Sequence, residues 1–251
     1  MLQNRSIVMY WRYIMQDRDK YKDFTFGHRK EGFDNHIDAS IRHYSTLHDD
    51  VVNLSRYFVE NDTEVVDIGC STGKTIEAMI EQNHPTAPNA LYCGVEYADV
   101  FQDEMTARQT RLNEAGHHVF FQNKNIIHHS FENCSLVTSI FTLQFMQPLW
   151  RQRVLANIYN GLNEGGAFIF AEKTYAENSR IQDMMTSTFY EYKSQHFTYE
   201  DIMEKEKTLR TMLKPMTWND LISLLTSVGF DSTKIQPFWM NHLFVGAIAI
   251  K

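Results

Sequence analysis

Hydrophobic positions follow two different periods along the chain, and the change between them falls near position 60. From Asp34 to Phe58 apolar residues recur at helical spacing, which predicts one or two helices. After that point, short apolar runs rich in β-branched residues alternate with amphipathic segments. Strands are therefore predicted over 63–68, 91–95, 118–122, 136–141 and 167–172, with helices over 73–82, 100–115 and 149–162. Two or three helices over 176–228 and a hairpin of strands 234–239 and 243–250 complete the expected elements.

The alternation of strands and helices predicts an α/β fold. It consists of a doubly wound, mostly parallel seven-stranded sheet with right-handed crossovers and a C-terminal antiparallel hairpin. Ligands on such Rossmann-like sheets bind at the carboxyl ends of the strands, near the switch in strand order. The chain contains no repeat, low-complexity tract or Pro/Gly-rich linker. One domain over 23–251 is therefore expected, with the helices at 176–228 covering the ligand site and residues 1–22 forming an N-terminal extension, an accessory helix.

The sharpest chemical signal is a glycine turn, the segment Gly69 to Gly73 between the first predicted strand and its helix. A phosphate-binding loop needs four residues before Gly-Lys-Thr, but only three separate these two glycines. A dinucleotide fingerprint needs G-x-G-x-x-G, which is absent here. With Asp67 ahead of the first glycine, the turn instead matches the nucleoside-binding turn of class I methyltransferases. The alternative is an ordinary strand-to-helix turn, in which glycine only relieves the backbone.

Two polar residues at the ends of the following strands fit the same site. Glu96 ends the second predicted strand, where a carboxylate can accept hydrogen bonds from both ribose hydroxyls of a nucleoside. Asn125, followed by Ile126 after the third strand, stands where methyltransferases commonly contact the adenine amino group. A solvated acid at a strand end and an asparagine that turns the chain are the alternatives for these residues. Together with the glycine turn, they predict an adenosine-type ligand.

Three segments resemble the carboxy-S-adenosylmethionine synthase family of the tRNA wobble-uridine modification pathway. They are Phe-Thr-Leu-Gln-Phe at 141–145, Ile-Tyr-Asn-Gly-Leu-Asn-Glu-Gly-Gly at 158–166, and Glu-Lys at 172–173. The resemblance runs from about Phe24 to Lys251. It implies a homodimer that makes a carboxylated cofactor from S-adenosylmethionine and prephenate. By position, the family's cofactor contacts fall on Tyr44, Gly69, Cys70, Ser71, Glu96, Tyr97, Asn125 and Ile126.

The chain departs from the family at two positions of this site. Ile140 replaces an asparagine of the family. The family's arginine that holds the new carboxylate aligns within 205–207, and the ungapped match places Glu206 there. A glutamate repels a carboxylate, and the neighbouring lysines lack the bidentate fork of arginine. Arg210, one helical turn further along, could replace it.

Three functions remain open on the sequence. The first is a methyltransferase with an unidentified acceptor, which needs little more than an acceptor placed in line with the sulfonium methyl. Tyr44, Tyr97 and Phe141 could line such a pocket, with core packing as the alternative for each. His36 or His43 could serve as a base beside Tyr44, with a helix histidine satisfied by its partners as the alternative. The second is a carboxy-S-adenosylmethionine synthase in which Arg210 compensates for the lost arginine. The third is a nonenzymatic S-adenosylmethionine-binding partner subunit.

Charge and composition restrict the possible binding partners, cellular compartment and metal sites of the protein. The net charge of −7 argues against general nucleic-acid binding. Three cysteines without a C-x-x-C pair indicate reduced thiols in a cytoplasmic protein. Neighbouring histidines at 117–118 and 128–129 would point to opposite faces of a strand, so no metal site is expected. No apolar stretch reaches the ~18 residues of a membrane span. A small-molecule substrate is the expected partner.

Overall fold

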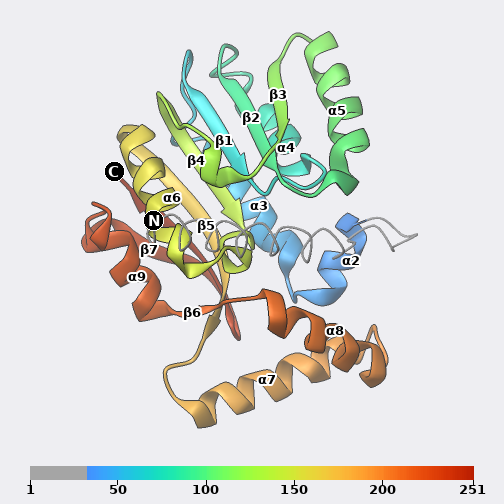
Figure 1. Cartoon of the computed structure of the whole chain (residues 1–251). Coiled ribbons are helices and arrows are strands. Elements are labelled where there is room, and N and C mark those ends of the chain that lie inside the picture. Colours follow the sequence, from blue (N-terminus) through green and yellow to red (C-terminus); the bar gives the residue numbers. More distant parts are fainter. Residues whose placement is uncertain (1–32) are drawn as a thin grey trace, which may run out of the picture.

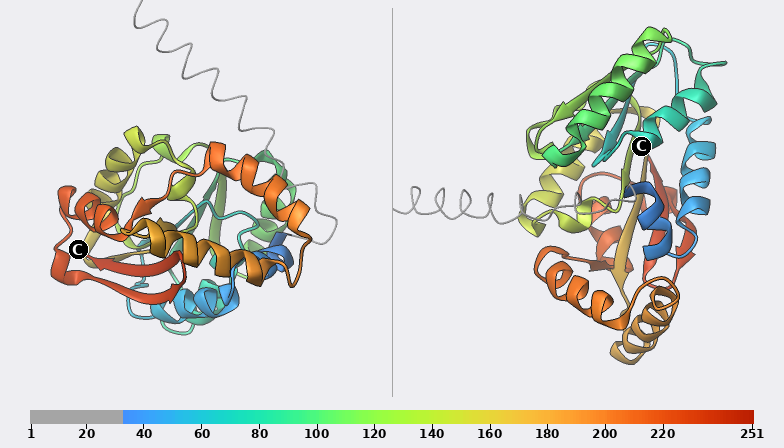
Figure 2. Two further views of the ribbon diagram at one scale, coloured as in Figure 1. Left: turned by 90° about the horizontal axis from the view of Figure 1, so that it is seen from below. Right: turned by 90° about the vertical axis from the view of Figure 1, so that its right-hand side faces the viewer.

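The structure, a computed structural model, describes residues 33–251 (Figures 1 and 2). The accessory helix expected at 1–22 lies outside the described residues. The helices expected ahead of the sheet are α2 (Phe33–Ser40) and α3 (Tyr44–Ser55). Between them, His43 has a left-handed φ of 61°. α3 buries Leu47 and Val51 in the core.

Within residues 33–251, eight strands form one sheet in the order β3-β2-β1-β4-β5-β8-β7, with β6 paired to β5 outside this path. They are β1 (Glu64–Ile68), β2 (Leu91–Glu96), β3 (His118–Asn123), β4 (Cys134–Ile140), β5 (Leu162–Tyr175), β6 (Met216–Thr217), β7 (Ile235–Asn241) and β8 (Phe244–Ile250). β1 to β5 run parallel, whereas β8 is antiparallel to β5 and β7. The predicted sheet with its C-terminal hairpin is confirmed, and the strand order switches between β1 and β4.

Helices cover both faces of the sheet. The helices that follow α3 are α4 (Lys74–Asn83), α5 (Gln102–Glu114), α6 (Pro148–Gly161), α7 (Ser179–Lys193), α8 (Tyr199–Met212) and α9 (Trp218–Ser227), with short 3-10 turns at η2 (Asp99–Phe101), η3 (Ile126–His128), η4 (Leu143–Phe145) and η5 (Ser232–Lys234). α3, α4 and α5 supply Leu47, Ile76 and Leu112 to one core cluster. α6 and α9 supply Leu155 and Leu225 to the other. The molecule therefore has three layers.

β1 shows how the sequence divides the core. Val65 packs into the cluster with α3 and α4, and Val66 into the cluster with α6 and α9, because neighbouring strand residues point to opposite faces. Both side chains are fully buried, which explains why a central parallel strand reads as a continuous apolar run. Each such burial contributes about 1.5–3 kcal/mol.

β5 is longer than the sequence predicts. α6 ends at Gly161 and β5 begins at once, so Gly165 and Gly166, which fall between the predicted helix 149–162 and the predicted strand 167–172, lie in the strand. The pairing of β4 with β5 shifts register between Cys134 and Leu136, and Gly165 has a φ of 80°. These glycines therefore belong to an irregular start of β5. The two-residue β6, which pairs with the other end of β5, was not predicted.

The helices expected over 176–228 are α7, α8 and α9, and they occupy two different places. α7 and α8 lie side by side beyond the carboxyl end of β5 (Figure 1). α9 packs against α6 on one face of the sheet. None of the helices in residues 33–251 is both long and apolar enough to cross a membrane.

Candidate functional site

The glycine turn lies between β1 and α4, at the carboxyl end of a central strand. Three of its residues adopt the left-handed backbone region, with φ of 68° at Gly69, 49° at Ser71 and 80° at Gly73. The N–H of Gly69 donates to the carbonyl of Val95 at 2.7 Å, and that of Gly73 donates to the carbonyl of Cys70 at 2.7 Å. The turn therefore presents its backbone at the sheet edge where ligands of doubly wound folds bind.

Space as well as backbone conformation requires glycine at position 69. A Cβ on Gly69 would lie 2.2 Å from Oγ1 of Thr142. Thr142 belongs to the residues that follow β4, here called the 141–145 segment. The missing side chain at Gly69 lets this segment close on the glycine turn, so the loops at the ends of β1 and β4 touch.

Glu96, the last residue of β2, ties the glycine turn to the end of its own strand. Its Oε2 accepts a hydrogen bond from the N–H of Ser71 at 2.9 Å, and its Oε1 accepts from Tyr97 at 2.7 Å and Ala98 at 2.8 Å. Burial raises the pKa of Glu96, and the three amides act in the opposite direction. Carboxylate oxygens have further acceptor capacity, so Glu96 can still receive the two hydroxyls of a ribose.

Asp67 lies beneath the glycine turn in β1 and is 3% exposed. Its Oδ1 accepts a hydrogen bond from Oγ1 of Thr138 on β4 at 2.6 Å. Burial raises the pKa of Asp67 to about 7; the Thr138 hydrogen bond opposes this shift and the charge of Glu96 adds to it. The charge under the turn therefore changes close to neutral pH.

Glu172 supports the 141–145 segment from β5. Its Oε1 accepts a hydrogen bond from the N–H of Leu143 at 3.0 Å. The backbone N–H of Lys173 donates to Oε1 of Gln144 at 2.8 Å. Burial raises the pKa of Glu172 to about 8, and the charge of Arg151 acts in the opposite direction. Glu172 and Lys173 therefore anchor the Phe-Thr-Leu-Gln-Phe motif that accompanies them in the family resemblance.

Phe141 joins the 141–145 segment to the helices that precede the sheet. Its φ is 55°, in the left-handed region, and its N–H donates to the carbonyl of Ala171 at 2.7 Å. The ring centroid of Phe141 lies 6.2 Å from that of Tyr44, the first residue of α3, and 5.6 Å from that of Phe244. Of the three aromatic residues expected to line a pocket, Tyr44 and Phe141 thus lie together, whereas Tyr97 is exposed after β2.

The remaining predicted cofactor contacts border the glycine turn in different ways. The Sγ atom of Cys70 lies 3.7 Å from Sδ of Met105 on α5, so its side chain points away from the glycine turn and toward α5. The side chain of Asn125 accepts a hydrogen bond from the backbone N–H two residues later at 3.0 Å. This is the bond expected of an asparagine that turns the chain, the alternative given for this residue above. Of the other residues, Ile126 is buried, Ile140 half-buried and Tyr97 exposed.

Glu206 is buried on α8 and lies among cations. Its Oε1 is 3.8 Å from Nζ of Lys193 on α7. Two lysines approach the ring of Phe189, with Nζ of Lys193 4.9 Å and Nζ of Lys173 5.4 Å from its centroid. Burial lowers the pKa of Lys173, an effect that Glu206 opposes and Arg210 strengthens. Lys173, Lys193, Glu206 and Arg210 are called the charged cluster below.

A row of aromatic rings connects the charged cluster to the 141–145 segment. The ring centroids of Phe189 and Phe244 are 5.3 Å apart, and Phe244 also contacts Phe141. Arg210 itself is exposed. The side chain of His36, on α2, lies outside the described part of the chain, and His43 is exposed at the start of α3.

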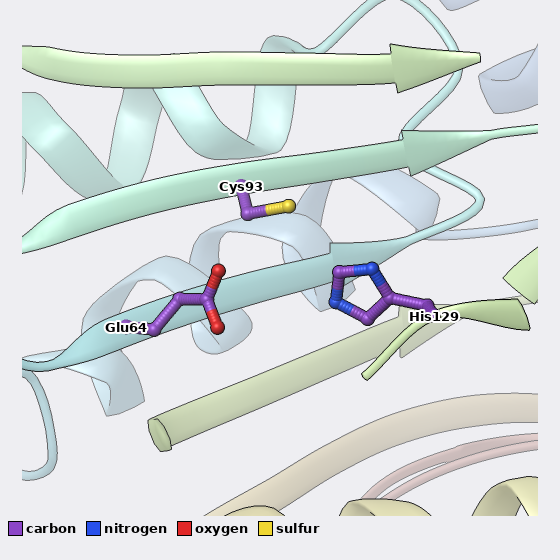
Figure 3. A group of neighbouring side chains, drawn as sticks. All are labelled: Glu64, Cys93 and His129. Atoms are coloured by element: carbon purple, nitrogen blue, oxygen red, sulfur yellow. The ribbon is translucent and has the colours of Figure 1, made fainter. Parts of the chain in front are cut away.

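Sequence reasoning misses several residues of this region. Nothing in the sequence around Thr138 predicts its hydrogen bond to Asp67, because the two residues lie on different strands. No sequence signal marks Lys193 either. No metal site is expected from the sequence, yet Glu64, Cys93 and His129 place possible ligand atoms within 4.8 Å of one another (Figure 3).

Known proteins are similar to this chain in sequence over most of its length. A methyltransferase domain family matches residues 66–168, which include the glycine turn, Glu96 and the 141–145 segment. The carboxy-S-adenosyl-L-methionine synthase of Staphylococcus epidermidis is 32% identical over 221 residues, covering 87% of this chain and 92% of that protein. The chain belongs to the carboxy-S-adenosyl-L-methionine synthase family. The synthase of Methylococcus capsulatus is 29% identical, over 94% of this chain and 97% of that protein.

Solved structures show the same fold as this synthase-family chain. Human N-acetylserotonin methyltransferase in complex with S-adenosylmethionine has a TM-score of 0.55 at 15% identity, covering 83% of this chain and 52% of that one. A possible exported protein from Bordetella parapertussis has a TM-score of 0.59 at 15% identity, covering 81% and 66%. The fold is that of class I methyltransferases, and the synthase-family chain is an S-adenosylmethionine-dependent transferase, as the sequence predicts.

In this synthase-family chain, Gly69→Ala should lower the free energy of unfolding by more than about 1 kcal/mol, because alanine disfavours a positive φ and its Cβ overlaps Thr142. Thr142→Gly removes the overlap but not the backbone cost. The double variant should therefore recover part of the loss, with a coupling energy of about 0.5–3 kcal/mol in chemical denaturation. Additive effects of the two substitutions would show that the loops do not press on each other.

Asp67→Asn should change how the stability of this synthase-family chain depends on pH. The folded pKa, about 7, lies above the unfolded value near 3.8, so the folded state binds the proton more tightly. The free energy of unfolding of the native protein should therefore fall relative to that of Asp67→Asn between about pH 4 and pH 7, by up to about 4 kcal/mol. Above pH 7 the difference should stay constant. Denaturation of both proteins across this range checks it, and parallel curves would refute the raised pKa.

Proposed function

We propose that the protein is a methyltransferase that moves the methyl group of S-adenosylmethionine to a small-molecule acceptor. The single observation that carries this proposal is the buried carboxylate of Glu206 in the charged cluster. The cofactor supplies the reactive group. The protein's part is to hold the sulfonium and the acceptor in line, in a pocket from which water is excluded.

The cofactor-binding part of the proposal assigns S-adenosylmethionine to the glycine turn. Gly69 and Ser71 would pass along the nucleoside, Glu96 would receive the ribose hydroxyls, and Asn125 and Ile126 would border the adenine. The three amides that hold Glu96 support this assignment, because they fix both carboxylate oxygens before a ligand arrives. Preformed acceptors bind a ligand without first losing side-chain freedom.

Tyr44 and Phe141 would form the wall beside the sulfonium. Aromatic faces attract cations, with interaction energies of about 0.5–2 kcal/mol depending on desolvation. Their ring centroids lie 6.2 Å apart, and Phe141 is 6% exposed. A sulfonium placed on this side of the glycine turn would therefore meet aromatic rings rather than a counter-charge, which suits a methyl group about to leave it.

Glu206 favours methyl transfer over carboxy transfer. The family resemblance aligns the arginine that holds the cofactor's added carboxylate within 205–207, and the ungapped match places Glu206 there. A carboxylated cofactor would bring a second negative charge toward the buried Glu206, whose oxygen is 3.8 Å from Nζ of Lys193. At a separation of 4 Å and an effective dielectric constant near 20, like charges repel by about 4 kcal/mol. Plain S-adenosylmethionine lacks the added carboxylate.

A second candidate function is carboxy-S-adenosylmethionine synthesis from S-adenosylmethionine and prephenate. The relatives that bear this name match nearly the full chain. The charged cluster also favours it in one respect, since Lys173, Lys193 and Arg210 outnumber Glu206. A net positive cluster can accept one carboxylate if Lys193 exchanges its partner.

The decisive experiment is mass spectrometry of the cofactor after the purified protein is incubated with S-adenosylmethionine, with and without prephenate. Methyl transfer predicts plain S-adenosylmethionine or S-adenosylhomocysteine in both samples. A cofactor heavier by one carboxylate, formed only with prephenate, would establish the synthase instead. Tight cofactor binding without turnover of any acceptor in a metabolite extract would support a nonenzymatic partner subunit.

Glu206→Arg should increase the retained fraction of carboxylated cofactor by tenfold or more when that cofactor is supplied, because about 1.4 kcal/mol of improved electrostatics is a factor of ten. Lys207→Arg is the matched control, since Lys207 is the exposed neighbour on the same helix. Equal retention in the two variants, measured by mass spectrometry after gel filtration, would remove Glu206 from the cofactor site.

We also propose that the protein is a homodimer that associates through α7 and α8. Both helices expose large apolar side chains, at helical spacings that keep them on one face of each helix. On α7, Ile181 is 47% and Met184 62% exposed; on α8, Tyr199 is 60% and Met203 38% exposed. Clustered exposed apolar residues are typical of association surfaces.

Met184→Glu should convert the dimer to a monomer, because a charge buried in an apolar interface loses its hydration. The molar mass from light scattering should fall by half at the same protein concentration. Leu91→Glu is the control, since Leu91 is 42% exposed and opens β2 at the amino ends of the parallel strands, whereas α7 and α8 lie beyond the carboxyl end of β5. A dimer that survives Met184→Glu, or a native protein that is already monomeric, would contradict the proposed interface.

The cellular location and the pathway of the protein are the last parts of the proposal. Buried free thiols at Cys70, Cys93 and Cys134 suit the reducing cytoplasm. A place in tRNA wobble-uridine modification would apply if the synthase activity is found. A methyltransferase would instead serve the pathway of its own acceptor.

A further inference from the structure

Four residues with metal-binding side chains gather on one face of the sheet, away from the glycine turn. Glu64 opens β1 and pairs with Cys134 of β4, while Cys93 of β2 pairs with Val66. Residues 64 and 66 of one strand share a face, and neighbours in register point the same way. Glu64, Cys93 and Cys134 therefore lie on one face, and His129, which follows η3, approaches from the connection between β3 and β4.

The ligand atoms of this cluster converge. Figure 3 shows the carboxylate of Glu64, the sulfur of Cys93 and the ring of His129 facing a shared space, with possible ligand atoms all within 4.8 Å of one another. Sγ of Cys134 lies 3.8 Å from Oε2 of Glu64. Bond lengths of about 2.0–2.3 Å to zinc place tetrahedral ligands roughly 3.3–3.8 Å apart. Small rotations of Glu64, Cys93 and His129 would therefore bring these three ligands around one ion, and Cys134 would complete the site by rotating its sulfur from Oε2 of Glu64 toward the ion.

His129 supplies an independent sign that a ligand is missing. It is 5% exposed, and among the residues that the structure describes neither ring nitrogen has a hydrogen-bond partner. Its ring makes an edge contact with Phe131 at 4.7 Å between centroids. Buried polar atoms in proteins are normally paired, because an unpaired one loses its hydration without compensation. The adjacent His128 is exposed, so only His129 faces the cluster.

We propose that Glu64, Cys93 and His129, with Cys134 as the fourth ligand, bind one zinc ion. Sulfur, imidazole and carboxylate ligands together favour zinc, whereas magnesium and calcium take oxygen ligands. Glu132 and Lys124 lie near Glu64 and carry opposite charges, so their electrostatic effects on Glu64 oppose each other.

The proposed ion has a structural role and does not depend on the proposed function. Glu64 and Gly69 are five residues apart, which is about 16 Å along a strand, so the ion lies far from the glycine turn. It would link β1, β2, β4 and the loop that carries His129. Four protein ligands leave no open position for a substrate, which is typical of structural zinc sites.

Cobalt(II) titration of the metal-free full-length protein tests the proposal. One equivalent should produce thiolate-to-cobalt charge-transfer absorption and the visible bands of tetrahedral cobalt, and zinc should abolish both. Zinc at a hundredfold excess over its Kd should raise the thermal midpoint by roughly 5 °C or more. Absence of thiolate absorption, or binding without a one-to-one end point, would overturn the site.

Two matched substitutions separate a site from adventitious binding. His129→Gln should weaken cobalt binding at least tenfold, whereas His128→Gln should leave it unchanged. Cys93→Ser should reduce the charge-transfer absorption, with folding checked by circular dichroism and retained S-adenosylmethionine binding. Should Cys93→Ser not fold, Cys134→Ser gives the same readout. Equal binding by His129→Gln and His128→Gln would refute the proposal.

Discussion

The carboxylate of Glu96, held by three backbone amides, is the interaction on which the geometry of the site depends. It joins the glycine turn after β1 to the residues after β2, so two loops that would otherwise move separately share one anchor. Desolvation of a carboxylate is costly unless such donors offset it. One of the three amides is that of Ser71, which has a left-handed conformation that a non-glycine residue adopts rarely. The acid thus stabilises the turn that it would help to bind a nucleoside.

The central strands and the glycine turn could be predicted from the sequence because their causes are local. Buried parallel strands read as apolar runs, and Gly69 and Gly73 mark positive φ. The start of β5 and the pairing of β6 could not be predicted, because they depend on partners distant in the chain. The same holds for Lys193 and Glu206, which meet only because α7 and α8 pack together. No periodicity in the sequence records that contact.

Strain in the 141–145 segment is concentrated at Phe141, a bulky residue with a φ of 55°. Such a conformation costs on the order of 1–3 kcal/mol and persists only where the surroundings fix it. Here the surroundings are the carbonyl of Ala171, the carboxylate of Glu172 and the ring of Tyr44. The strained residue is also the one whose ring stands between the glycine turn and the charged cluster. Support from β5 and α3 therefore positions a side chain at the place where the chemistry is proposed.

The Lys193–Glu206 pair would determine whether the charged cluster can bind the added carboxylate of a carboxylated cofactor. An arginine at position 206 would offer the paired N–H donors of its guanidinium to a carboxylate. The glutamate instead pairs with the ammonium group of Lys193. An incoming carboxylate would have to displace Glu206 from that lysine and leave it as a buried charge, which is strongly unfavourable. The half-buried Lys173, whose pKa burial lowers, offers only part of the compensation. A cofactor without the extra carboxylate would leave the pair intact, so a buried glutamate in the charged cluster supports the proposed methyl transfer on electrostatic grounds.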